Sequence, residues 1–78
     1  MSTLIDRPIA GSVRDGKFVI RLSSGTEISF PIAENPRLSG ASEAELLAFE
    51  FSPNGVHWPA LDEDLSIRGL LEGNWGQA

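Results

Sequence analysis

The stretch "HWPALDED", residues 57–64, contains most of the side chains in this sequence that could do chemistry. It holds the single histidine, His57, and three consecutive acids, Asp62, Glu63 and Asp64. An imidazole and a carboxylate together can bind a metal ion or transfer a proton. One imidazole with exposed carboxylates is nevertheless an unselective ligand set, because the further nitrogen or sulfur ligands of most protein metal sites are missing.

A catalytic site at His57 would need a nucleophile, for which Ser52 and Ser66 are the candidates, and also an orienting acid and an oxyanion pocket. Neighbouring residues point in different directions, so the three acids cannot all face one point. A chain of 78 residues also has little room for an enclosed pocket. We therefore predict no enzymatic activity, no cofactor and no metal site, and keep a minimal metal or enzyme site at His57 as the weakest alternative.

A structural role explains the same stretch more simply. We expect Trp58 to pack its indole on the core and Pro59 to end the strand. The acids then precede a final helix, whose N-terminus favours negative charge, and Asp64 or Ser66 caps that helix. "HWPALDED" is thus interpreted as a strand-to-helix corner that also presents an acidic surface to a partner protein.

Other candidate contacts lie outside this corner. Trp75, in the Gly-rich segment "GNWGQA", is expected to fold back onto the core or to anchor a partner. Arg37 is expected to form an exposed ion pair with the acidic corner. The full set of candidate partner-binding residues is Asp62, Glu63, Asp64, Arg37, Trp75 and His57.

Local patterns predict the elements that position these residues. Period-two alternation with β-branched and aromatic residues indicates strands, and Asp15-Gly16, Ser24-Gly25 and Pro53-Asn54-Gly55 indicate turns. The predicted strands cover residues 12–14, 17–22 and 27–31, followed by a second hairpin of 49–51 and 56–58. The predicted core residues are Phe18, Ile20, Leu22, Ile28, Phe30, Phe49, Phe51 and Trp58.

Two short helices complete the prediction. Ser42 and Glu45 form a capping box that begins a helix over residues 43–47. Ser66 begins a second helix, "IRGLLEG", which ends at Gly73. We predict one α+β domain over residues 1–78, with a small antiparallel sheet of four to five short strands packed against these helices. Unpaired edges of that sheet would allow a homodimer or a partner strand to add there.

Composition narrows the classes of function. The net charge is −5, and the six basic residues are scattered along the sequence, so we expect no direct contact with nucleic acid. The absence of cysteine excludes disulfides and thiolate metal sites. No apolar run approaches the ~20 residues that cross a membrane, and no secretory leader is evident, so the expected location is cytoplasmic.

The run "FPIAENPRLSGASEAELLAFEFSPNGVHWPALDEDLSIRGLLEG" resembles the small bacterial family called domain of unknown function 2442. The resemblance covers about residues 13–73, and Asn35 stands where many relatives carry an aromatic residue. The matching residues are Pro31, Pro36, Arg37, Leu38, Ala41, Gly55, His57, Trp58, Pro59, Leu61, Asp62, Glu63, Asp64, Ser66, Gly69, Leu70 and Leu71.

The resemblance implies a small α+β domain without established enzymatic activity, whose gene neighbourhoods look like toxin–antitoxin pairs. The leading hypothesis is therefore a non-enzymatic, antitoxin-like module that binds and restrains a small partner protein. The alternative is an acidic nucleic-acid mimic from a mobile element, for example anti-CRISPR-like, that blocks a basic nucleic-acid-binding complex. The His57 metal or enzyme site is the second alternative.

Overall fold

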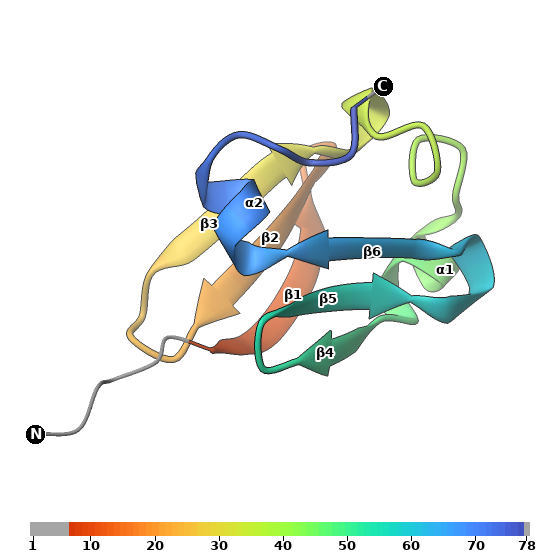
Figure 1. The fold of residues 1–78 in the computed structure, drawn as a ribbon. Helices are drawn as coiled ribbons and strands as arrows, with labels where there is room; N and C mark the ends of the chain where they lie inside the picture. Colours follow the sequence, from red (N-terminus) through yellow and green to blue (C-terminus); the bar gives the residue numbers. More distant parts are fainter. Residues whose placement is uncertain (1–6, 78) are drawn as a thin grey trace, which may run out of the picture.

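The computed structural model describes residues 7–77 and shows two three-stranded antiparallel sheets that share one core (Figure 1). Sheet A has the order β1-β2-β3 and sheet B the order β4-β5-β6. The strands are β1 (Pro8–Arg14), β2 (Lys17–Leu22), β3 (Glu27–Pro31), β4 (Glu50–Ser52), β5 (Gly55–Trp58) and β6 (Glu63–Ser66). The helices are α1 (Glu43–Leu47) and α2 (Ile67–Leu71), with 3-10 turns η1 (Ile32–Glu34) and η2 (Pro59–Leu61). The α+β class is confirmed, but one sheet of four to five strands is corrected to six strands in two sheets.

Sheet A follows the predicted alternation. Phe18 and Ile20 point into the core and pair with Phe30 and Ile28 across the β2–β3 ladder. The β1–β2 turn has positive φ at Asp15 and Gly16, as a two-residue hairpin turn of type I′ requires. β1 starts at Pro8, four residues before its predicted start at residue 12. Pro8 and Gly11 are poor strand formers, so the sequence pattern does not mark this part of the strand, and its register shifts between Pro8 and Ala10.

Sheet B contains a strand that the sequence did not predict. β6 pairs with β5 from Gly55 opposite Ser66 to Trp58 opposite Glu63. The acids therefore lie on the β5–β6 hairpin, and the predicted corner leading directly into a helix is wrong. Ser66 is the N-cap of α2, with its Oγ 2.9 Å from the backbone N of Gly69, so the cap is Ser66 and not Asp64.

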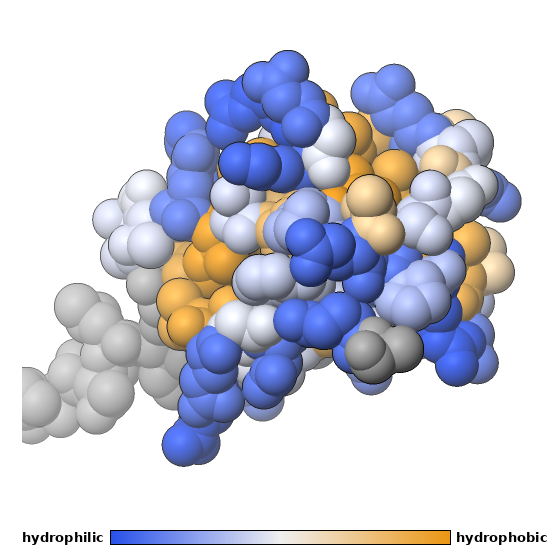
Figure 2. Space-filling view, turned by 90° about the horizontal axis from the view of Figure 1, so that it is seen from above, coloured by the Kyte–Doolittle hydropathy of each residue, from blue (hydrophilic) through white to orange (hydrophobic). Residues whose placement is uncertain are grey.

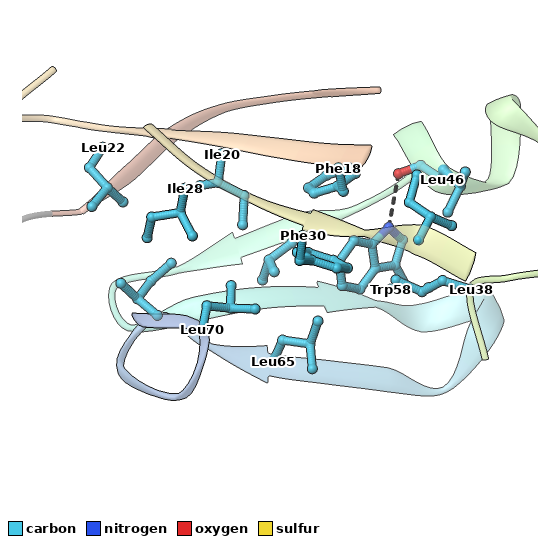
Figure 3. Close-up of a cluster of buried hydrophobic side chains, with 13 residues drawn as sticks. Phe18, Ile20, Leu22, Ile28, Phe30, Leu38, Leu46, Trp58, Leu65 and Leu70 are labelled. Carbon is cyan, nitrogen blue, oxygen red and sulfur yellow. Dashed lines mark hydrogen bonds between the residues drawn. The ribbon is translucent and has the colours of Figure 1, made fainter. Parts of the chain in front are cut away.

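The first helix matches its prediction. The Ser42 hydroxyl accepts a hydrogen bond from the backbone of Glu45 at 3.1 Å, and the Glu45 carboxylate accepts one from the backbone of Ser42 at 2.8 Å. This reciprocal pair is the predicted capping box. At the other end of α1, the carbonyl of Leu46 accepts a hydrogen bond of 2.8 Å from Nε1 of Trp58 (Figure 3). The buried indole therefore joins α1 to β5.

The core lies between the two sheets (Figure 3). Phe18 and Trp58 meet edge to face with ring centroids 5.1 Å apart, and both are fully buried. Of the predicted core residues, only Phe49 and Phe51 are half-buried, at the margin of the cluster. The other buried apolar residues that join the predicted ones in this cluster are Ile32, Leu38, Leu46, Val56, Leu65, Ile67 and Leu70.

The surface has few large apolar side chains. In the described part of the chain, the exposed ones are Ile9, Leu47 and Leu71, each on a different element. Figure 2 views the molecule from above Figure 1 and shows hydrophobic residues between polar ones. None of the described helices is long and apolar enough to span a bilayer.

Candidate functional site

The three consecutive acids point in different directions, as their adjacency predicted. Asp62 lies in the left-handed region, at φ 53° and ψ 44°, where the chain leaves η2 and enters β6. Its side chain is 93% exposed, and its Oδ2 lies 3.5 Å from Nη1 of Arg37, so the predicted ion pair is present. Asp64 is also exposed and projects from the outer face of sheet B. Asp62 and Asp64, named here the acidic pair, are thus accessible to a partner.

Glu63 has a different environment. It is half-buried, and its Oε2 accepts a hydrogen bond of 2.8 Å from Nδ2 of Asn35. Its Oε1 accepts one of 3.1 Å from the backbone N–H of Asp64. Both carboxylate oxygens are therefore used within the fold. Glu63 holds the hairpin against the segment after η1, so its predicted place in a binding surface does not fit its contacts.

Asn35 is the centre of this arrangement and was not predicted as a site residue. Among the described residues, Asn35 is the polar residue that is buried, and none of its surface is exposed. Its Oδ1 accepts hydrogen bonds from the backbone N–H groups of Arg37 at 2.9 Å and Leu38 at 3.1 Å. Its Nδ2 donates to Glu63 and, at 2.8 Å, to the carbonyl of Trp75. Asn and Pro are common in loops, but the pair Asn35-Pro36 does not reveal that the amide is buried.

Trp75 folds back onto the core, which is the first of its two expected roles. Its half-buried indole packs against the core cluster, and its carbonyl accepts the bond from Asn35. Its ring nitrogen Nε1 is buried and has no hydrogen-bond partner. The next residue, Gly76, has φ +82° and lies against Asn35. A Cβ built at Gly76 would overlap Nδ2 of Asn35. Trp75 is therefore part of the fold more than of an exposed surface.

His57 is half-buried on the outer face of sheet B, in a cross-strand row between Glu50 and Asp64. Its Nδ1 lies 3.1 Å from the carbonyl oxygen of Glu63, so a ring that carries its proton on Nδ1 donates there. The candidate nucleophile Ser66 instead accepts the capping bond of α2. Within residues 7–77, no group of three or more His, Cys, Asp or Glu side chains is placed to hold a metal ion.

Three of the six basic residues share one face of the fold, although all six are scattered in sequence. Residues 7–31 carry four bases and two acids, a net charge of +2, whereas residues 32–77 carry two bases and eight acids, a net charge of −6. Arg14, Lys17 and Arg21 all project from the outer face of sheet A. Their spacing along the sequence therefore does not reveal this grouping, which strand pairing produces.

Comparisons with known proteins support this fold. A protein of unknown function from Rhodospirillum rubrum, solved by crystallography, is 32% identical with a TM-score of 0.78, and the match covers 92% of each chain. An uncharacterized protein from Chromobacterium violaceum, solved by NMR, is 32% identical with a TM-score of 0.79, over 92% of this chain and 70% of that one. No curated protein matches the chain. Residues 12–75 match the family described as "Protein of unknown function (DUF2442)", and the chain belongs to that family.

Proposed function

We propose that this chain is a non-enzymatic protein-interaction module that binds and restrains a partner protein, in the manner of an antitoxin. The acidic pair is the main contact in this proposal. The observation that carries it is that the three acids of "DED" differ in exposure. Glu63 is half-buried and hydrogen-bonded to Asn35, while Asp62 and Asp64 are exposed. The two exposed carboxylates flank the anchored one and can face a basic partner.

The backbone at Asp62 supports the same proposal. A non-glycine residue in the left-handed region carries a conformational cost, which asparagine and aspartate tolerate best. Strained backbone of this kind is concentrated at sites of function. Asp62 makes one exposed ion pair at 3.5 Å, and such pairs contribute only about 0–1 kcal/mol to stability. Its carboxylate is thus available to select a basic counterpart.

The test is affinity capture from the native cell with three forms of the protein: the parent, the double variant Asp62→Asn and Asp64→Asn, and a control. The control, Glu34→Gln with Glu43→Gln, removes the same charge from two exposed acids elsewhere. We expect the parent and the control to retain a small partner that the acidic-pair variant loses. Equal retention by all three forms would place the binding surface away from the acidic pair.

A mimic of nucleic acid remains the second candidate, because residues 32–77 carry a net charge of −6. Such an inhibitor binds the basic groove of a nucleic-acid-binding complex, and salt screens that attraction strongly. The same capture experiment distinguishes the two at low and high salt. A basic nucleoprotein complex that elutes between ~0.1 and ~0.5 M NaCl favours the mimic, whereas a small partner that stays bound favours the antitoxin-like module.

A further inference from the structure

We propose that the outer face of sheet A is a second docking surface, which takes an acidic segment of a partner protein. This proposal does not depend on the acidic pair, because the two surfaces lie on different sheets and have opposite charge. It starts from the strand alternation in sheet A. Phe18 and Ile20 point into the core, so Lys17, Val19 and Arg21 of the same strand must point outward.

The neighbouring strands complete this outward face. Across the ladders, Lys17 stands opposite Arg14, and Val19 stands between Ser12 and Ser29. Arg21 stands opposite Glu27. The short serine side chains leave the middle row low, while the longer side chains on either side stand above it. Val19 itself is only 6% exposed although it lies on the outer face, because these longer side chains shield it.

The result is a depression with charged walls. It has a volume of about 310 Å³, and its lining residues are Arg14, Asp15, Lys17, Val19, Glu27 and Ser29. The Ser29 hydroxyl and the cationic walls can receive the carboxylate of a glutamate side chain, whose methylene groups would lie over the small exposed part of Val19. Ligand sites in general combine an apolar lining with a few placed polar groups.

The cations on this face are not neutralised within the fold. Glu27 is shared, with Oε1 3.6 Å from Arg14 and Oε2 3.5 Å from Arg21. One carboxylate thus serves two guanidinium groups, whose side chains remain 62% and 58% exposed. Lys17 is exposed and takes part in none of the ion pairs of the described residues. Three cations (Arg14, Lys17 and Arg21) against two acids (Asp15 and Glu27) leave this face a net charge of +1, which can attract an incoming anion.

A short acidic polypeptide fits this face better than a nucleic acid does. Proteins that bind duplexes neutralise several phosphates, about 6–10 in strong cases, along an extended basic surface. Sheet A supplies three cations with Asp15 and Glu27 among them. A long polyanion would also extend past this small face towards residues 32–77, whose net charge of −6 repels it. A segment with a few carboxylates meets the cations without that repulsion.

The test is an NMR titration of the ¹⁵N-labelled chain with a hexaglutamate peptide at low salt, in which the chemical shifts of the backbone amides are measured. A neutral Gly-Ser peptide of equal length and a hexamer of thymidylate serve as comparison probes. We expect hexaglutamate to shift amides of β1, β2 and β3 in a saturable way that ~0.3 M NaCl abolishes. Shifts that are missing, or that fall mainly on sheet B, would overturn the proposal.

Three variants sharpen the result. Arg14→Gln with Lys17→Gln should weaken hexaglutamate binding about five- to twentyfold, whereas Glu27→Gln should strengthen it about two- to fivefold by releasing both arginines. Arg68→Gln, which removes an exposed arginine of α2, should leave the affinity for hexaglutamate unchanged. If the double variant does not fold, Lys17→Gln alone decides the question. Unchanged affinity in the sheet A variants contradicts the proposal, and tighter binding of thymidylate to the same face contradicts the class of partner.

Discussion

Asn35 shows how one buried amide can organise a small fold. An amide offers two donors and an acceptor with two lone pairs, and Asn35 uses both of its polar atoms on four partners. These partners come from the loop that follows it, from Glu63 at the start of β6 and from Trp75. Burial of such a group is tolerated only when its hydrogen bonds are made. The side chain therefore fixes the position of three segments that are distant in sequence.

Replacing Asn35 by alanine removes all four bonds at once. The backbone N–H groups of Arg37 and Leu38 lose their acceptor, and Glu63 loses a donor to a half-buried carboxylate. We expect the free energy of unfolding to fall by about 2–4 kcal/mol, measured by urea denaturation. The exposed residue Asn54 provides the control, since Asn54→Ala should change the free energy of unfolding by less than about 0.5 kcal/mol. A stable Asn35→Ala protein would contradict the structural role assigned to this amide.

The two tryptophans should respond differently to the same conservative change. Trp58 donates a buried hydrogen bond to Leu46, whereas the Nε1 of Trp75 is buried without a partner. Trp58→Phe should therefore cost about 2–3 kcal/mol, because it leaves a cavity and an unpaired carbonyl. Trp75→Phe should cost less than about 1 kcal/mol, since it removes an unsatisfied donor along with part of the ring. Thermal or urea denaturation of the pair gives the comparison, and equal losses would refute this difference.

The strands and helices divide into those that local sequence specifies and those that tertiary contacts specify. β2, β3 and α1 have the predicted bounds, because each is marked by alternation, a glycine turn or a capping box. β6 has none of these marks. Its sequence, Glu63–Ser66, contains two acids and one apolar residue, and acids are poor strand formers. It is a strand because β5 pairs with it and Leu65 enters the core.

In the candidate site too, local sequence specifies some residues and tertiary contacts specify others. The exposure of Asp62 and its ion pair with Arg37 follow from charge and turn chemistry, so they could be expected from the sequence. The inward turn of Glu63 could not, because it depends on Asn35, 28 residues earlier in the chain. The cationic face of sheet A was hidden for a related reason. Arg14 stands opposite Lys17 only when β1 and β2 pair, and Glu27 of β3 forms ion pairs with both Arg14 and Arg21.

The pairing of β5 with β6 can be tested at Gly55. A Cβ built there would lie 2.4 Å from the carbonyl oxygen of Leu65 and 3.2 Å from the Cα of Ser66, so both contacts are with backbone. Gly55→Ala should push the strands apart and lower the free energy of unfolding by roughly 1–3 kcal/mol. Gly40→Ala is a matched control because nothing lies within 4 Å of its Cβ. Similar stability of the two variants in urea would contradict the close approach of these strands.

The molecule as a whole has to close a thin core with 78 residues, and the segment after α2 completes that closure. Trp75 reaches back across 40 positions to Asn35, and its indole covers the margin of the core cluster. Figure 1 shows this segment passing from α2 over the end of β3. Domains of this size bury only about 60% of their unfolded surface, so each such contact is a large share of the total stability.

Removing residues 74–78 should therefore destabilise the whole domain and not only its end. The truncated chain loses the apolar contact of Trp75 and one of the two acceptors of the Asn35 amide. We expect the free energy of unfolding to fall by about 2–4 kcal/mol in urea, out of a total near 5 kcal/mol for so small a domain. Gly76→Ala tests the same contact in the full-length chain, because its Cβ would overlap Asn35 and Glu63. If both variants unfolded at the urea concentration of the parent protein, the segment after α2 would not be needed to close the core.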